Sequence, residues 1–141
     1  MFRRVTSAPI ADSFAFHRAT PDVTVDGHVR RKVVELGEWV MARERVYLDK
    51  CFWINMRAAR TNSPSPPGAS DLLASLAAGV AAGKLICPVS DALFLELMKQ
   101  TDLATRSATA ELIDQLSCGV TLSPQPTRVA TEVAHFIHAN V

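Results

Sequence analysis

Two acidic residues interrupt apolar stretches of this chain, and they are the first candidates for chemistry. Asp49 follows Val46–Leu48, which has the composition of a buried strand, and an apolar helix is expected directly after it. Glu96 lies within the apolar run LFLELM, and Lys99 is the nearest basic residue that follows it. A carboxylate in such surroundings is unfavourable unless it is solvated, paired or bound to a metal ion.

The carboxylates of Asp49 and Glu96 would face one crevice if the strand that ends at Asp49 lies beside the strand that ends near Pro88, because ligands bind at the carboxyl ends of parallel strands. Two carboxylates that close repel each other, so one stays protonated unless a cation lies between them. Mg²⁺ or Mn²⁺ would remove that conflict, since both ions prefer oxygen ligands. A structural alternative is that Asp49 caps the helix that follows it, while Glu96 reaches solvent or pairs with Lys99.

The periodicity of apolar residues predicts short strands that alternate with helices. Short apolar runs indicate strands at 45–48, 84–88 and 120–123. Apolar residues at helical spacing indicate helices at 28–42, 52–60, 71–82, 91–100, 104–118 and 127–140. Strands that are apolar throughout and separated by helices are typical of a parallel sheet covered on both faces. The sequence therefore predicts an α/β fold.

Local signals mark the ends of several helices. Asp26 and Ser90 are expected to cap the helices that follow them, and Gly83 and Gly119 to end the helices that precede them. The segment TNSPSPPGAS, residues 61–70, holds three prolines and a glycine and is expected to be a loop.

The last helix and both tryptophans are expected to contribute to the core. The helix at 127–140 would turn Val129, Val133, Phe136 and Ile137 inward. The helix at 28–42 carries four apolar residues at helical spacing, Val29, Val33, Leu36 and Val40, and in the non-enzymatic alternative it offers a dimer or partner surface. Glu132, His135 and His138 form the polar face of that last helix and are expected to be solvated. Trp39 and Trp53 are expected to be core residues rather than stacking platforms.

Length and composition fit one domain preceded by an arm. Residues 1–27 show no clear period and are expected to be an irregular N-terminal arm, and residues 28–141 are expected to form the α/β domain. The chain of 141 residues is 48% apolar and 21% charged, which is ordinary for a soluble globular protein. Its net charge of +1 provides no overall basic field for nucleic acid or anionic membrane.

The cysteines and the hydropathy of the chain bear on its location. Cys51, Cys87 and Cys118 are an odd set without CxxC spacing, each beside an apolar run. We expect them to be reduced core residues of a cytoplasmic protein. No apolar run reaches membrane-spanning length, so no membrane partner is expected.

Three segments together resemble the PIN-domain family, and the match is to a bacterial branch of these metal-dependent nucleases, which include many toxins of toxin–antitoxin pairs. VYLDKCFWINM resembles the opening strand, its acidic residue and the helix that follows. LICPVSDALFLELMKQ resembles the second strand and the helix with the second acid, and TRSATAELIDQLSCGVTL resembles the next helix and third strand. The resemblance covers about residues 44–138.

The resemblance implies a three-layer sandwich and a metal-dependent endoribonuclease activity. Asp49 and Glu96 would be catalytic ligands of Mg²⁺ or Mn²⁺, and the metal would position and activate a water for attack on a phosphodiester of RNA. Lys99 and Arg106 would contact the nucleic-acid backbone. An antitoxin or a second copy of the chain would be the protein partner.

The chain also departs from the family pattern in ways that define an alternative. Lys50 and Cys51 follow the first acid, where many members have a small polar residue. The third and fourth acids of the family come after the third strand and its helix, and this sequence stops before that point, so we expect a PIN-like fold shortened at its C-terminus. The alternative is a catalytically inactive PIN-like module used for protein or nucleic-acid binding.

Overall fold

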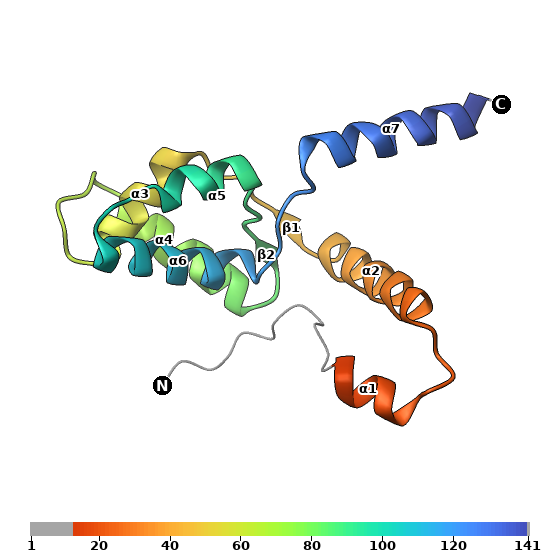
Figure 1. Cartoon of the computed structure of the whole chain (residues 1–141). Coiled ribbons are helices and arrows are strands. Elements are labelled where there is room, and N and C mark those ends of the chain that lie inside the picture. Colours follow the sequence, from red (N-terminus) through yellow and green to blue (C-terminus); the bar gives the residue numbers. More distant parts are fainter. Residues whose placement is uncertain (1–12, 141) are drawn as a thin grey trace.

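The structure is a computed structural model, and it describes residues 13–140. Seven helices and two strands follow one another in this part of the chain (Figure 1). They are α1 (Ser13–Ala19), α2 (Val25–Met41), β1 (Glu44–Arg45), α3 (Lys50–Arg60), α4 (Ala69–Ala81), β2 (Leu85–Ile86), α5 (Asp91–Met98), α6 (Leu103–Ser117) and α7 (Gln125–Asn140). The described chain is thus mostly helical with a small sheet, which agrees with the coarse prediction of an α/β fold.

The sheet is parallel but shorter than predicted. Glu44 of β1 lies opposite Leu85 of β2, and Arg45 lies opposite Ile86. The predicted strand at 120–123 is reduced to one parallel bridge between Val89 and Thr121. The β1–β2 ladder ends at Pro88, which has no N–H to donate toward β1. The amide of Cys87 points to the other side of β2, where it donates to the carbonyl of Leu116 in α6 at 2.8 Å.

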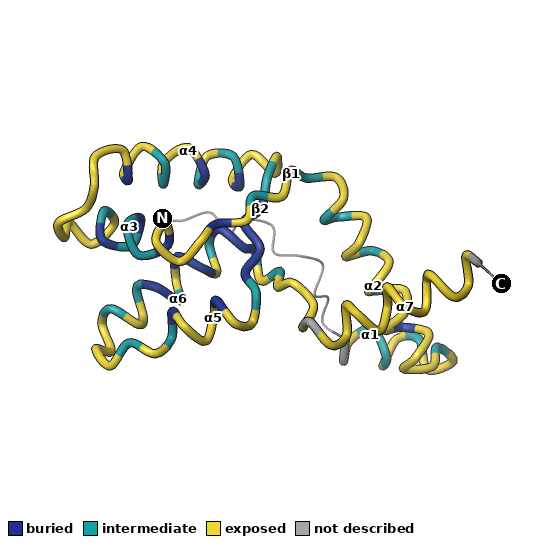
Figure 2. The backbone as a smooth tube through the Cα atoms, turned by 90° about the horizontal axis from the view of Figure 1, so that it is seen from above, coloured by how far each residue is buried: buried dark blue, intermediate teal, exposed yellow. Residues whose placement is uncertain are grey.

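The core lies among α3, α4, α5, α6 and β2. Helices α3, α4 and α6 pack against one another, α4 also contacts β2, and α5 packs on α6. Figure 2 shows that buried positions concentrate in this group of elements. The largest fully buried apolar side chains come from α3, β2, α5 and α6: Trp53, Met56, Ile86, Leu97, Leu112 and Leu116. Burial of this apolar surface is the main favourable contribution to the stability of this unit.

Several helix ends follow the predicted chemistry. The hydroxyl of Ser90 accepts a hydrogen bond from the amide of Leu93 at 3.2 Å, which caps α5 as predicted. Gly83 has φ +68°, the left-handed conformation that ends α4, and the amide of Lys84 returns to the carbonyl of Gly79. The predicted cap Asp26 is wrong: Thr24 caps α2 by accepting from the amide of Gly27 at 3.1 Å.

The prediction of an irregular arm over residues 1–27 is wrong in its second half. Residues 13–19 form α1, and α2 already begins at Val25. The two helices are joined by ring contacts, because Phe16 and His17 of α1 lie 4.6 Å and 4.7 Å from the ring of His28. Residues 1–12 lie outside the described part of the chain.

The expectation that α7 turns its apolar face into the core is also wrong. Both α2 and α7 extend away from the group formed by α3–α6 (Figure 1), and no extensive packing of α2 on α7 occurs within residues 13–140. Exposed fractions are 51% for Val29, 63% for Val33 and 51% for Val133. Leu36, Val129, Phe136 and Ile137 are exposed as well.

Two further core predictions fail. Trp53 is fully buried as expected, but Trp39 is only half-buried and lies under the guanidinium of Arg43, 3.7 Å from the ring centroid. Cys51 is exposed, whereas Cys87 is buried and Cys118 partly buried. Within residues 13–140, no helix is both long and apolar enough to cross a membrane.

Candidate functional site

Asp49 lies where the chain leaves β1 and enters α3. Its backbone is extended, and its carbonyl accepts the first hydrogen bond of the helix from the amide of Phe52 at 3.0 Å. Its side chain makes no capping hydrogen bond in the described structure; the thiol of Cys51, 3.7 Å from Oδ2, is its neighbour. The structural alternative in which the Asp49 carboxylate caps α3 is therefore wrong, and this exposed carboxylate is available to a ligand.

Glu96 is held at the same end of the molecule by the residue that follows Asp49. The ammonium of Lys50 lies 3.2 Å from Glu96 Oε2. The suggested pairing of Glu96 with Lys99 is wrong, because the ion-pair partner of Glu96 is Lys50 at the start of α3. Lys99 lies just beyond the C-terminal end of α5. Both partners of the ion pair are about half exposed, at 46% and 52%, so solvent screens their attraction.

A second contact joins the two strand ends. The hydroxyl of Tyr47, which follows β1, lies 3.3 Å from the hydroxyl of Ser90, which follows β2. The carboxyl ends of β1 and β2 therefore meet, as expected for neighbouring parallel strands. We call the group Tyr47, Asp49, Lys50, Ser90 and Glu96 the strand-end cluster.

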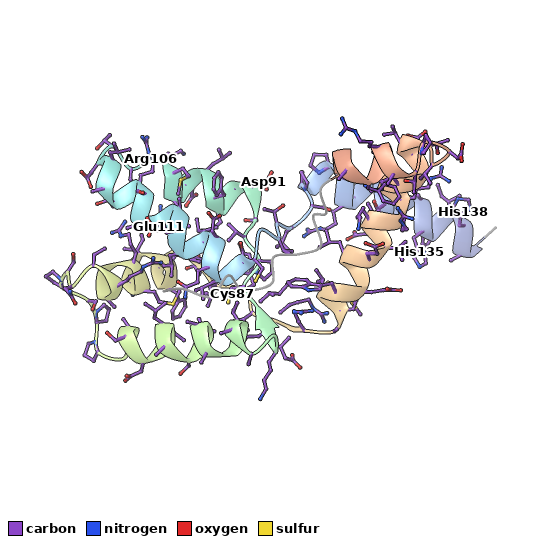
Figure 3. The ribbon with its side chains drawn as sticks, turned by 90° about the horizontal axis from the view of Figure 1, so that it is seen from below. Cys87, Asp91, Arg106, Glu111, His135 and His138 are labelled. Carbon is purple, nitrogen blue, oxygen red and sulfur yellow. The ribbon has the colours of Figure 1, made fainter. Side chains whose placement is uncertain are left out.

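Asp91 follows Ser90 of this cluster in the sequence, and sequence reasoning did not single it out. It is exposed at the start of α5 (Figure 3), and its carboxylate accepts from the amide of Ala92 at 2.9 Å. The available signal was its position, because it stands directly after the capping Ser90 at the end of an apolar strand. The same logic that singled out Asp49 applies to this residue.

The donor set of the cluster suits a hydrated ion rather than a closed metal site. Among the residues described, no group of three or more His, Cys, Asp or Glu could hold a metal ion. Asp49 and Glu96 are exposed carboxylates, and Mg²⁺ commonly binds through one or two carboxylates, several waters and substrate phosphates. The ammonium of Lys50 now supplies positive charge to Glu96, so a metal ion would compete with it.

The predicted nucleic-acid contacts do not gather around this cluster. Arg106 is exposed near the N-terminal end of α6, and Figure 3 shows it at the opposite end of the α5–α6 pair from Asp91. Lys99 is exposed just beyond the end of α5. Lys50, rather than either of these residues, is the cation at the strand ends.

Other reactive groups are placed outside the strand-end cluster. Burial, and secondarily the thiol of Cys118, raises the pKa of Cys87 to about 11, so this cysteine stays a thiol rather than a nucleophilic thiolate. His135 and His138 are exposed on α7 (Figure 3), and Glu132 lies 3.8 Å from Arg128 on the same helix, as the solvated-face prediction expects.

An open pocket of about 310 Å³ lies between α3, α4 and α6. It is lined by small and apolar side chains, among them Ala59, Leu73 and Ala77. Arg60 at its rim is bound by Glu111 at 2.9 Å and by Gln115 at 3.3 Å. Because Ala59 and Arg60 end α3 whereas Lys50 begins it, the pocket is separate from the strand-end cluster.

Comparisons of this chain with protein-family models, with curated proteins and with solved structures give no match.

Proposed function

We propose that this chain is a PIN-like, Mg²⁺- or Mn²⁺-dependent endoribonuclease domain in which Asp49 and Glu96 hold the metal. The observation that carries the proposal is the uncapped carboxylate of Asp49 at the end of β1, next to Lys50, whose ammonium is 3.2 Å from Glu96. Glu96, in the second half of α5, is thereby linked to the start of α3, the residue before which is Asp49. Such places are where α/β proteins bind ligands.

The exposure of the cluster leaves room for a phosphodiester substrate, and its acidic charge requires a cation for such a substrate to bind. A metal ion bound by Asp49 and Glu96 would position and activate a water and offset charge that builds up on the phosphate. The ammonium of Lys50, released from Glu96 when the metal binds, would be placed to contact the backbone of the RNA. Lys99 and Arg106 remain candidates only for contacts along the strand beyond the cluster.

The three-layer PIN-like arrangement belongs to the same proposal. It is supported by the parallel pairing of β1 with β2 and by the parallel bridge that follows, from Val89 to Thr121. These three segments lie side by side in chain order, with β2 in the middle. We further propose a cytoplasmic location, which the three free cysteines support.

The test is cleavage of end-labelled single-stranded RNA by the full chain with Mn²⁺. The wild type is compared with Asp49→Ala and Glu96→Gln, and with Asp114→Ala as a control for loss of an exposed acid on α6. Cleavage that needs Mn²⁺, falls at least a hundredfold in the two cluster variants and persists in the control is the expected result. A folded wild type that leaves the RNA intact, or cleavage that survives Asp49→Ala, would reject the assignment.

A second candidate function is a catalytically inactive PIN-like module that binds a protein, such as an antitoxin or a second copy of the chain. The observation that favours it is the exposure of the apolar faces of α2 and α7, which the α3–α6 core does not cover. Retained RNA binding without cleavage, or a stable complex formed through those helices, would support this function.

A further inference from the structure

Two helices of this chain carry matching rows of exposed apolar side chains. On α2 the row is Val25, Val29 and Val33, and on α7 it is Val129, Val133 and Ile137. Both rows repeat every four residues and consist only of β-branched apolar residues. Each of the six side chains is between 47% and 66% exposed. We call them the α2 row and the α7 row.

Within residues 13–140, no other element packs extensively on either row. The two helices leave the core in different directions (Figure 1). A helix of this length is marginal in water, and most helices in proteins are stabilised by packing of an apolar face. An uncovered row on each of two helices therefore indicates an intermolecular contact.

The geometry of the rows points to a second copy of the same chain. Rows with four-residue spacing form the ridges that interdigitate in the commonest class of helix packing. We infer that the chain forms a two-fold symmetric dimer in which the α2 row of each copy packs against the α7 row of the other. In this reciprocal packing, one symmetric interface covers both rows of both copies.

The exposed area reaches the lower end of what a stable dimer buries. The two rows together with Leu36 expose roughly 600 Å² per copy, so a symmetric pair in which all of these residues are fully covered removes about 1,200 Å² from water. A partner that offers a single helix would cover only one of the two rows.

The charges beside the rows favour the same arrangement. On α2, Glu35 pairs with both Lys32 and Arg31, and on α7, Arg128 pairs with Glu132. These pairs form within each helix, so the rows can meet without burying one of these charges alone. This inference does not depend on the metal site.

The first experiment is sedimentation velocity of the full chain over a range of micromolar concentrations. The expected mass is twice 15.3 kDa for the wild type and 15.3 kDa for Val33→Glu and for Val133→Glu. Val34→Glu and Ala134→Glu are matched controls, because both positions are exposed on the same helices but outside the rows, and both variants should stay dimeric. Circular dichroism of each variant confirms that it is folded.

The second experiment identifies which helices meet. Chains with Val33→Cys and chains with Val133→Cys, both also carrying Cys51→Ser, are mixed and oxidised. A disulfide that joins the two different variants, and far less crosslinking in either variant alone, is expected. A monomeric wild type, a dimer that resists Val33→Glu, or efficient crosslinking of Val133→Cys with itself would overturn the α2–α7 exchange.

Discussion

Lys50 and Glu96 form an ion pair across the strand ends, with 3.2 Å between Nζ and Oε2. The pair joins the first residue of α3 to the middle of α5, over a separation of 46 residues in sequence. It places a cation where the proposed function requires a metal ion. The contribution of Lys50 to metal binding is therefore the sharpest question that the site raises.

Replacing Lys50 by alanine is expected to strengthen metal binding. Removal of the ammonium releases Glu96, and an exposed ion pair is worth about 0.2–1 kcal/mol, so the affinity for Mn²⁺ should rise by a factor of about 1.4 to 5. Titration followed by the electron paramagnetic resonance of free Mn²⁺, at low ionic strength, measures this. Lys99→Ala serves as the control and should bind like the wild type. Equal or weaker binding by Lys50→Ala would count against Glu96 as a ligand.

Replacing Asp49 by asparagine is expected to leave the free energy of unfolding within about 0.5 kcal/mol of wild type, because its side chain does not cap α3. Ser90→Ala is the contrasting variant. It removes the hydroxyl that accepts from the amide of Leu93, and should lower stability by about 1 kcal/mol. Urea unfolding followed by circular dichroism compares the two. A loss of 1 kcal/mol or more in Asp49→Asn would show that Asp49 has a structural role.

Stability is expected to fall as the pH drops below about 6.5, in part through His28. Burial lowers the pKa of His28, the nearby His17, Arg31 and Lys32 lower it further, and Glu35 opposes them. At a pH between the two pKa values of His28, the unfolded chain binds a proton at this residue and the folded chain does not. The contribution of His28 to stability is therefore complete above its pKa in the unfolded chain and is lost as the pH falls toward its lower pKa in the folded chain.

The variant that tests this pH dependence is His28→Phe, which should lose less stability than wild type between pH 7.5 and 5.5 in urea unfolding. His135→Phe, at an exposed position of α7, is the control and should behave like wild type. An unchanged pH profile in His28→Phe would assign the effect to other groups.

Trp53→Phe is expected to be the more damaging of the two tryptophan substitutions. The indole of Trp53 is fully buried, and its Nε1 donates to the carbonyl of Leu48 at 3.2 Å. Loss of the indole removes the donor to that buried carbonyl and creates empty space, which should lower the free energy of unfolding by about 1–3 kcal/mol. Trp39→Phe, at a half-buried position, should lower the free energy of unfolding by less than about 1 kcal/mol. Guanidinium unfolding of both variants decides whether this order holds.

The local part of the fold was predictable because local sequence causes it. Ser90 caps α5 and Gly83 ends α4, as their residue types indicate, and the helices at α3, α4, α5 and α6 lie within a few residues of their predicted bounds. The lengths of the strands were not predictable in this way. They depend on which distant carbonyl each amide reaches, as the bond from Cys87 to Leu116 shows.

The candidate site was likewise predictable only in part: the sequence singled out individual residues, whereas their partners depend on tertiary contacts. The sequence alone singled out Asp49 and Glu96 because burial of a lone carboxylate is unfavourable, yet both side chains are exposed in the structure. It missed Asp91, and it paired Glu96 with Lys99 because only neighbours in the chain can be paired from periodicity. The partnership of Glu96 with Lys50 arises from the meeting of two strand ends.

The sequence by itself determined which segments are helical, where several of them end, and which face of each helix is apolar, because these properties follow from residue type and short-range spacing. Only the tertiary structure decided what each apolar face meets. Val29 and Val133 have the same pattern as core residues, yet both are exposed, since α2 and α7 lie outside the core formed by α3–α6. Periodicity gives the direction of a face within its own helix, whereas burial depends on a second surface that approaches it from elsewhere in the chain or from another chain.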